Sequence, residues 1–163
     1  MVERQAVISK CGRFRYSLYR KWSEGPEIAW VMLNPSTADG EQDDPTIRRC
    51  MSFSKRDGFG SMLVANLFAY RATDPKKLLG LADPYGPLNG ATLAGLSGTV
   101  VAAWGATQRP HVPQSWLDKR AWVCLGTTKD GHPRHPLYVR ADQPFVPWLP
   151  VSERQLPPTK ETT

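Results

Sequence analysis

The sequence contains few cysteines and no long apolar run, and these absences exclude several classes of protein. Three cysteines in 163 residues, Cys11, Cys50 and Cys124, are odd in number and far apart. They indicate neither a disulfide framework nor a CxxC metal knuckle. No apolar stretch approaches the ~20 residues of a membrane span, and no signal-peptide pattern is present. We therefore expect a cytoplasmic protein with no membrane contact.

Three common motifs of enzymes are also missing. GxGxxG, GxxxxGK[ST] and GxSxG do not occur, which counts against dinucleotide-binding, P-loop and serine-hydrolase functions. One cluster of carboxylates could form a Mg²⁺ site or supply a general base. A solvated loop that ends in a helix cap is the better interpretation. The members of the cluster are Asp39, Glu41, Asp43 and Asp44. We expect no metal and no cofactor.

What the sequence does contain is an excess of positive charge and of loop-forming residues. Lys and Arg number 21 against 15 Asp and Glu, so the net charge is +6, which fits a polyanionic partner without requiring one. The composition is 40% apolar with six tryptophans, 15 prolines and 13 glycines. It predicts one packed, loop-rich domain over residues 1–150, and a polar, flexible tail over residues 151–163.

Four near-continuous apolar runs predict buried strands of a mainly parallel sheet. They cover residues 28–33, 62–68, 99–104 and 121–126. Residues 14–19, "FRYSLY", alternate apolar and polar and predict an extra N-terminal strand, antiparallel or at an edge.

Helix start signals lie between the predicted strands. Asp-Pro pairs occur at positions 44–45, 74–75 and 83–84, where Asp can cap free amides and Pro suits the first helical position. A weaker, glycine-containing helix is expected within residues 87–98. Strands alternating with helices predict an α/β fold with right-handed crossovers.

Polar residues follow the predicted strands, and ligands of parallel α/β sheets bind at the carboxyl ends of strands. Asn34 and Pro35 follow the first run, Asn66 lies in the second, Trp104 ends the third, and a loop with His132 and His135 follows the fourth. Taken singly, Asn34-Pro35 indicates a turn more strongly than a functional site. Asn66 fits a buried, hydrogen-bonded amide as well as it fits a ligand-binding residue. The two histidines lack carboxylate or thiolate partners at metal-ligand spacing.

Together and in this order, four segments resemble motifs of the uracil-DNA glycosylase superfamily. They are "VMLNPST", "LVANLFAYRA", "VVAAWGA" and "GHPRHPLY". The resemblance implies a three-layer αβα sandwich around a mainly parallel four-stranded sheet. The whole chain also resembles DUF1643, a bacterial and phage family of unknown function, through "LNPSTAD", "NLFAYRATDP" and "KDGHPRHPLY".

The glycosylase resemblance also implies roles for individual residues. Asn34 would orient a water toward the sugar carbon of a flipped nucleotide. A histidine would stabilise charge on the leaving base, and because this His-Pro loop is one residue longer than the pattern, both His135 and His132 are candidates. Asn66 would read the polar edge of the base and Leu137 would fill the vacated stack.

Further substrate contacts are expected from Pro35, Ser36, Phe53 and Trp104. DNA-backbone contacts are expected from Arg48, Arg49, Lys129 and Arg134. The expected function is hydrolysis of the glycosidic bond of a uracil-like or 5-modified pyrimidine in DNA. The alternatives are a non-catalytic module that binds nucleic acid or a modified nucleotide, and an enzyme acting on a free nucleotide or nucleoside.

Overall fold

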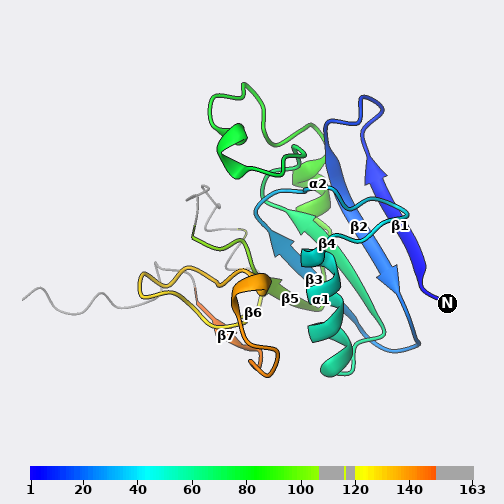
Figure 1. The fold of residues 1–163 in the computed structure, drawn as a ribbon, viewed down its shortest axis with the longest axis vertical. Coiled ribbons are helices and arrows are strands. Elements are labelled where there is room, and N and C mark those ends of the chain that lie inside the picture. Colours follow the sequence, from blue (N-terminus) through cyan, green and yellow to red (C-terminus); the bar gives the residue numbers. More distant parts are fainter. Residues whose placement is uncertain (107–115, 117–119, 150–163) are drawn as a thin grey trace, which may run out of the picture.

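The computed structural model describes residues 1–106, 116 and 120–149, so the predicted tail at residues 151–163 lies outside the described part. The described residues form a mixed α/β structure in which seven strands join in one sheet (Figure 1). The strands are β1 (Glu3–Ile8), β2 (Arg15–Lys21), β3 (Glu27–Met32), β4 (Ser61–Asn66), β5 (Thr99–Ala102), β6 (Trp122–Cys124) and β7 (Val146–Trp148).

The sheet is parallel at its centre and antiparallel toward both edges. In the order β1-β2-β4-β3-β5-β6-β7, the neighbours from β4 to β6 run parallel, whereas β1, β2 and β7 join antiparallel. The four central strands are those predicted from apolar runs, and β2 is the alternating strand expected at residues 14–19. The predicted sheet was nevertheless too small and too uniformly parallel.

The two strands that the sequence did not predict are edge strands. β1 is largely exposed and has no regular apolar alternation. β7 has three residues and contains Pro147, which an edge strand tolerates because its N–H side needs no ladder partner. Edge strands bury little surface, so their apolar patterns are weak.

Helix α1 (Pro45–Arg56) covers one face of the sheet and begins where the sequence predicted. The Asp44 carboxylate accepts a hydrogen bond from the Ile47 amide at 2.8 Å, and Pro45 occupies the first turn. Ile47 and Cys50 pack with Ile28 and Trp30 of β3 in one apolar cluster. This packing places the start of α1 beside the loop that leaves β3.

The opposite face carries a second apolar cluster, because successive residues of a strand face opposite sides. Ala29 and Val31 of β3 belong to this cluster, which also contains Trp104, Trp122 and Trp148. The three indoles pack edge to face, with ring centroids 5.1–5.9 Å apart. The short helix α2 (Asn89–Ala94) lies on this side, with Leu93 against the cluster.

The other two Asp-Pro pairs do not begin α-helices. Asp74 caps η1 (Pro75–Leu78), which is a 3₁₀ turn. Asp83 instead closes a turn, because its carboxylate accepts from the amides of Tyr85 and Gly86, both at 2.9 Å. Gly86 then takes a positive φ of 77°, which ends any helical course. A helix start at Asp83 was therefore wrong.

Among the described residues, no helix combines the length and apolar character that crossing a membrane requires.

Candidate functional site

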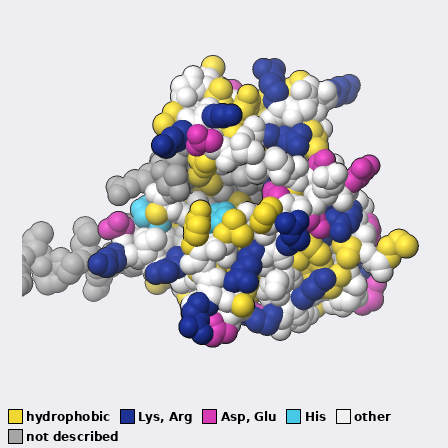
Figure 2. All heavy atoms as spheres, viewed as in Figure 1, with side chains coloured by type: hydrophobic (Ala, Val, Ile, Leu, Met, Phe, Trp, Pro, Cys, Tyr) yellow, Lys and Arg dark blue, Asp and Glu magenta, His cyan; other side chains and the backbone are white. Residues whose placement is uncertain are grey.

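A cavity of about 650 Å³ opens at the carboxyl ends of the central parallel strands. On the face drawn in Figure 2, imidazole side chains lie beside a hollow, with apolar and basic side chains around it. Eight of the predicted catalytic, substrate-binding and DNA-backbone residues line the cavity: Asn34, Ser36, Asn66, Trp104, Lys129, Arg134, His135 and Leu137. Segments that are up to about a hundred residues apart therefore contribute to one site.

Asn34 lies in the turn that follows β3, and its amide nitrogen is fully engaged. Nδ2 donates to the carbonyl oxygens of Ala72, at 2.7 Å, and of Pro35, at 3.0 Å. These bonds join the loop after β3 to the loop after β4. They also fix the orientation of the amide, so that Oδ1 is the end of the side chain left to accept a hydrogen bond.

Asn66 is the last residue of β4 and is 1% exposed. Its Oδ1 faces Nη2 of Arg15 at 3.5 Å, and its Nδ2 is buried with no partner among the described residues. The backbone carbonyls of Asn66 and Leu67 both accept from Nδ2 of Asn89, at 3.0 Å. The backbone at this strand end is thus satisfied, whereas the side chain retains a free donor.

Arg15, which the sequence analysis did not select, also lines the cavity and is 2% exposed. Its Nη1 donates to the carbonyl of Ala38 at 2.7 Å. Burial lowers the pKa of Arg15 to about 10, while the charge of Asp44 acts in the opposite direction. A charged residue in an alternating strand is ordinarily assigned to the solvent face. Arg15 is buried because the Asn34–Asp44 loop packs over β2, and the pattern of the strand alone does not predict that packing.

Of the two histidines predicted as site residues, His135 reaches the cavity and His132 does not. His135 caps η2 (Pro136–Tyr138), and its Nδ1 accepts from the Leu137 amide at 3.3 Å, so the neutral ring carries its hydrogen on Nε2. Burial lowers the pKa of His135, and Asp44 partly opposes this. The His132 backbone closes a turn with Thr128.

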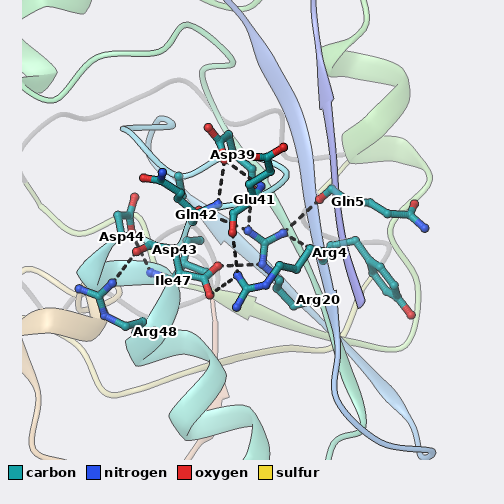
Figure 3. Close-up of polar contacts among 12 residues, drawn as sticks. Arg4, Gln5, Arg20, Asp39, Glu41, Gln42, Asp43, Asp44, Ile47 and Arg48 are labelled. Atoms are coloured by element: carbon teal, nitrogen blue, oxygen red, sulfur yellow. Dashed lines mark hydrogen bonds and ion pairs between the residues drawn. The ribbon is translucent and has the colours of Figure 1, made fainter. Parts of the chain in front are cut away.

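The acidic cluster is occupied by structural interactions (Figure 3). The buried guanidinium of Arg20 donates to Asp43 at 2.8 Å and to the Asp39 carbonyl at 2.6 Å. Arg4 pairs with the other oxygen of Asp43 at 2.6 Å. The Asp39 carboxylate accepts backbone amides, which lower its pKa. No group of three or more potential metal ligands occurs in the part of the chain that the structure describes.

Three predicted contact residues belong to the protein interior or to structural bonds instead of the cavity. Phe53 is buried beside Trp30 and Phe145, where it cannot stack on a ligand base. Pro35 is buried and does not line the cavity. Arg49 donates to the Val139 carbonyl at 2.6 Å and the Pro136 carbonyl at 3.4 Å, which ties α1 to η2.

Arg48 bonds the Asp43 carbonyl and also lies outside the cavity lining. Of the four cations predicted to contact DNA, Lys129 and Arg134 therefore remain at the cavity. The rim also includes Leu137 and Tyr138, which are 43% and 80% exposed. Tyr138 was not selected from the sequence, although it adjoins Leu137 in the "HPLY" segment.

The comparisons with known proteins identify a family but no characterised relative. No curated protein and no solved structure matches the chain. The family model described as "Protein of unknown function (DUF1643)" matches residues 15–137, a span that contains Arg15, Asn34, Asn66 and His135. The protein belongs to the DUF1643 family.

Proposed function

We propose that this protein is a base-recognising enzyme of N-glycosylase type, which hydrolyses the glycosidic bond of a uracil-like or 5-modified pyrimidine flipped out of DNA. One observation carries the proposal: Asn34, Asn66 and His135, which come from three separate segments, line the same cavity. The cavity is large enough for a pyrimidine nucleoside. Lys129 and Arg134 on its lining support a polyanionic partner.

The proposal includes a fold of the uracil-DNA glycosylase kind. Its support is the parallel centre of the sheet, with α1 on one face and α2 on the other, and a cavity at the carboxyl ends of those strands. The three antiparallel strands are additions at the edges of that centre.

Asn34 would act by positioning a water molecule. Its Oδ1 accepts a hydrogen bond from the water and directs it to the sugar carbon, but an amide cannot take a proton as a carboxylate does. The bond from the sugar carbon to the base breaks with its electron pair leaving on the base. Water oxygen then bonds to that carbon, and the proton that it loses passes through solvent to the departing base anion, which gives an abasic sugar and the neutral free base.

His135 would stabilise the departing base. Its lowered pKa keeps the ring neutral at neutral pH, and the Nε2 hydrogen is the donor available to a base carbonyl that gains negative charge. A donor of this kind is worth roughly 3 kcal/mol of transition-state stabilisation in other enzymes. Ser36 would lie near the 5-position, and Leu137 would enter the space that the flipped base leaves.

A non-catalytic binding module is the second candidate, and the bonding of Asn34 favours it. The side chain ties two loops together through Pro35 and Ala72, a structural role that accounts for the residue without chemistry. Such a module predicts saturable, salt-sensitive binding of DNA and no base release.

The direct experiment incubates the protein with single-stranded and duplex oligonucleotides that carry uracil or 5-hydroxymethyluracil, and detects abasic sites by alkaline cleavage. Strand cleavage that disappears in Asn34→Ala while DNA affinity persists supports the enzyme. Binding without cleavage in every substrate supports the module. The free deoxynucleosides serve as a third set, because equal action on them would place the activity on small molecules.

A further inference from the structure

The cavity contains a buried cation without a carboxylate partner. Arg15 is 2% exposed, and no carboxylate of the described residues forms an ion pair with it within 4.0 Å. Its partners are the Ala38 carbonyl at 2.7 Å and the Asn66 amide oxygen at 3.5 Å, and its Nε has none in the described part. Buried charges are normally paired, because leaving water is costly for an ion.

A second buried donor lies beside this cation. Nδ2 of Asn66 has no partner among the described residues, and the Asn66 oxygen faces Arg15. Buried polar groups of folded proteins nearly always find a partner. Two adjacent side chains with unused donors, both lining one cavity, indicate that a ligand supplies the missing acceptors.

The other charged residues of the cavity lining also favour a negatively charged ligand. Lys129 and Arg134 add positive charge, and the one carboxylate that the described residues contribute to the lining, Asp44, is held as the cap of α1. Arg15 stays protonated at neutral pH, since its pKa is about 10. Among the described residues, the lining therefore has three Arg or Lys side chains against one carboxylate.

We propose that Arg15 and Asn66 together bind an anionic oxygen group of the substrate, a carboxylate or a phosphate, and that Arg15 sets this preference. The inference rests on the proposed nucleotide pocket and narrows its substrate class from neutral pyrimidines to anionic ones. A guanidinium presents a planar fork of donors that matches two oxygens of an anion. The source of the anion is a carboxyl substituent on the base or the phosphate of the nucleotide.

The test measures binding by isothermal titration calorimetry with three probes: 2′-deoxyuridine, 5-carboxy-2′-deoxyuridine and 2′-deoxyuridine 5′-monophosphate. We expect one of the two anionic probes to bind at least about tenfold more tightly than the neutral nucleoside. The tighter of the two identifies whether the base or the phosphate supplies the anion. Equal affinity for all three probes, or preference for the neutral nucleoside, would overturn the inference.

Two variants assign the preference to this pair of residues. Arg15→Met removes the cation and should abolish the difference between anionic and neutral probes. Asn66→Asp places a carboxylate beside Arg15 and should also abolish it, while raising the melting temperature, so that the test survives if Arg15→Met fails to fold. Arg140→Gln is the control, since Arg140 is exposed and outside the cavity lining. Retention of the preference in either pocket variant would refute the assignment.

The outcome is separable from that of the proposed enzyme activity. If the protein prefers the anionic probes but releases no base, anion recognition is supported and the proposed glycosylase activity is contradicted. If the protein releases neutral uracil but shows no preference for the anionic probes, the glycosylase activity is supported and the proposed role of Arg15 is contradicted.

Discussion

The side-chain amide of Asn34 donates to the carbonyl oxygen of Ala72 across 2.7 Å and joins the loops that follow two adjacent parallel strands. The second hydrogen of the same amide bonds Pro35, so the amide has a single orientation. An asparagine can make these two donations and still present an oxygen, which aspartate cannot do.

Asn34→Asp should therefore destabilise the protein more than Asn34→Ala. Alanine loses two hydrogen bonds, which we expect to lower the free energy of unfolding by about 1–2 kcal/mol. Aspartate loses the same donors and adds a carboxylate facing two carbonyl oxygens. Urea unfolding followed by tryptophan fluorescence measures both changes, and an aspartate variant as stable as the wild type would contradict the amide orientation.

Arg20 should be a far larger contributor to stability than Arg4, although both bond Asp43. Arg20 is fully buried and also donates to the Asp39 carbonyl, so Arg20→Met leaves buried acceptors unpaired and should cost about 3–5 kcal/mol. Arg4 is partly exposed, and Arg4→Gln should cost less than about 1 kcal/mol. Hydrogen exchange of residues 35–44 should accelerate in the first variant alone. Similar losses in both variants would argue against the burial of Arg20.

His135 should make folding stability depend on pH. Burial lowers its folded-state pKa below the ordinary 6.5, so the unfolded chain binds a proton more readily. Stability should be greatest above about pH 6.5, fall as the pH drops below that value, and level off below the folded-state pKa. His135→Gln should remove this component from melting curves recorded across that window. His132→Gln is the matched control and should keep it.

The three cysteines should react with thiol reagents at very different rates. Hydrogen bonds from Ser9 and Arg13 lower the pKa of the exposed Cys11 to about 7, whereas burial raises the pKa of Cys50. At about pH 7 a chromogenic disulfide should label one thiol rapidly, and Cys11→Ser should abolish that phase. Cys50 and Cys124 should react only after unfolding. Rapid labelling of two or more thiols in the folded protein would contradict these environments.

Two glycine-to-alanine substitutions should have opposite effects. A Cβ on Gly60 would lie 2.6 Å from the Ser23 carbonyl oxygen and 2.7 Å from the Glu24 carbonyl carbon, so Gly60→Ala should destabilise by about 1–3 kcal/mol. Gly90 lies in α2 with nothing within 4 Å of the added atom. Gly90→Ala should stabilise by up to about 1 kcal/mol. The melting temperature should fall in Gly60→Ala and rise in Gly90→Ala relative to the wild type.

The sequence predicted the parts of the fold that depend on local chemistry. Asp44-Pro45 begins a helix because an apolar face follows it, whereas Asp83-Pro84 closes a turn because Gly86 takes a positive φ. Apolar runs located the four central strands. The edge strands β1 and β7 were not predicted, because exposed strands contain no continuous apolar run.

The candidate site was predicted to the extent that it follows from the ends of strands. Asn66 ends β4 and Asn34 lies in the turn after the adjacent parallel strand β3, and their meeting at one cavity follows from that topology. Arg15 was missed because its burial depends on a loop that is distant in the sequence. Phe53 was assigned to the substrate and Arg49 to the DNA backbone, because a helical pattern does not reveal which neighbouring segments cover the helix.

The bonds from Arg49 to the Pro136 and Val139 carbonyls have a mechanical consequence for the mouth of the cavity. They clamp the 3₁₀ turn that bears Leu137 onto the same helix whose first residues adjoin Asp44. On this side of the cavity, movement of Leu137 away from the pocket would therefore require these two hydrogen bonds to break.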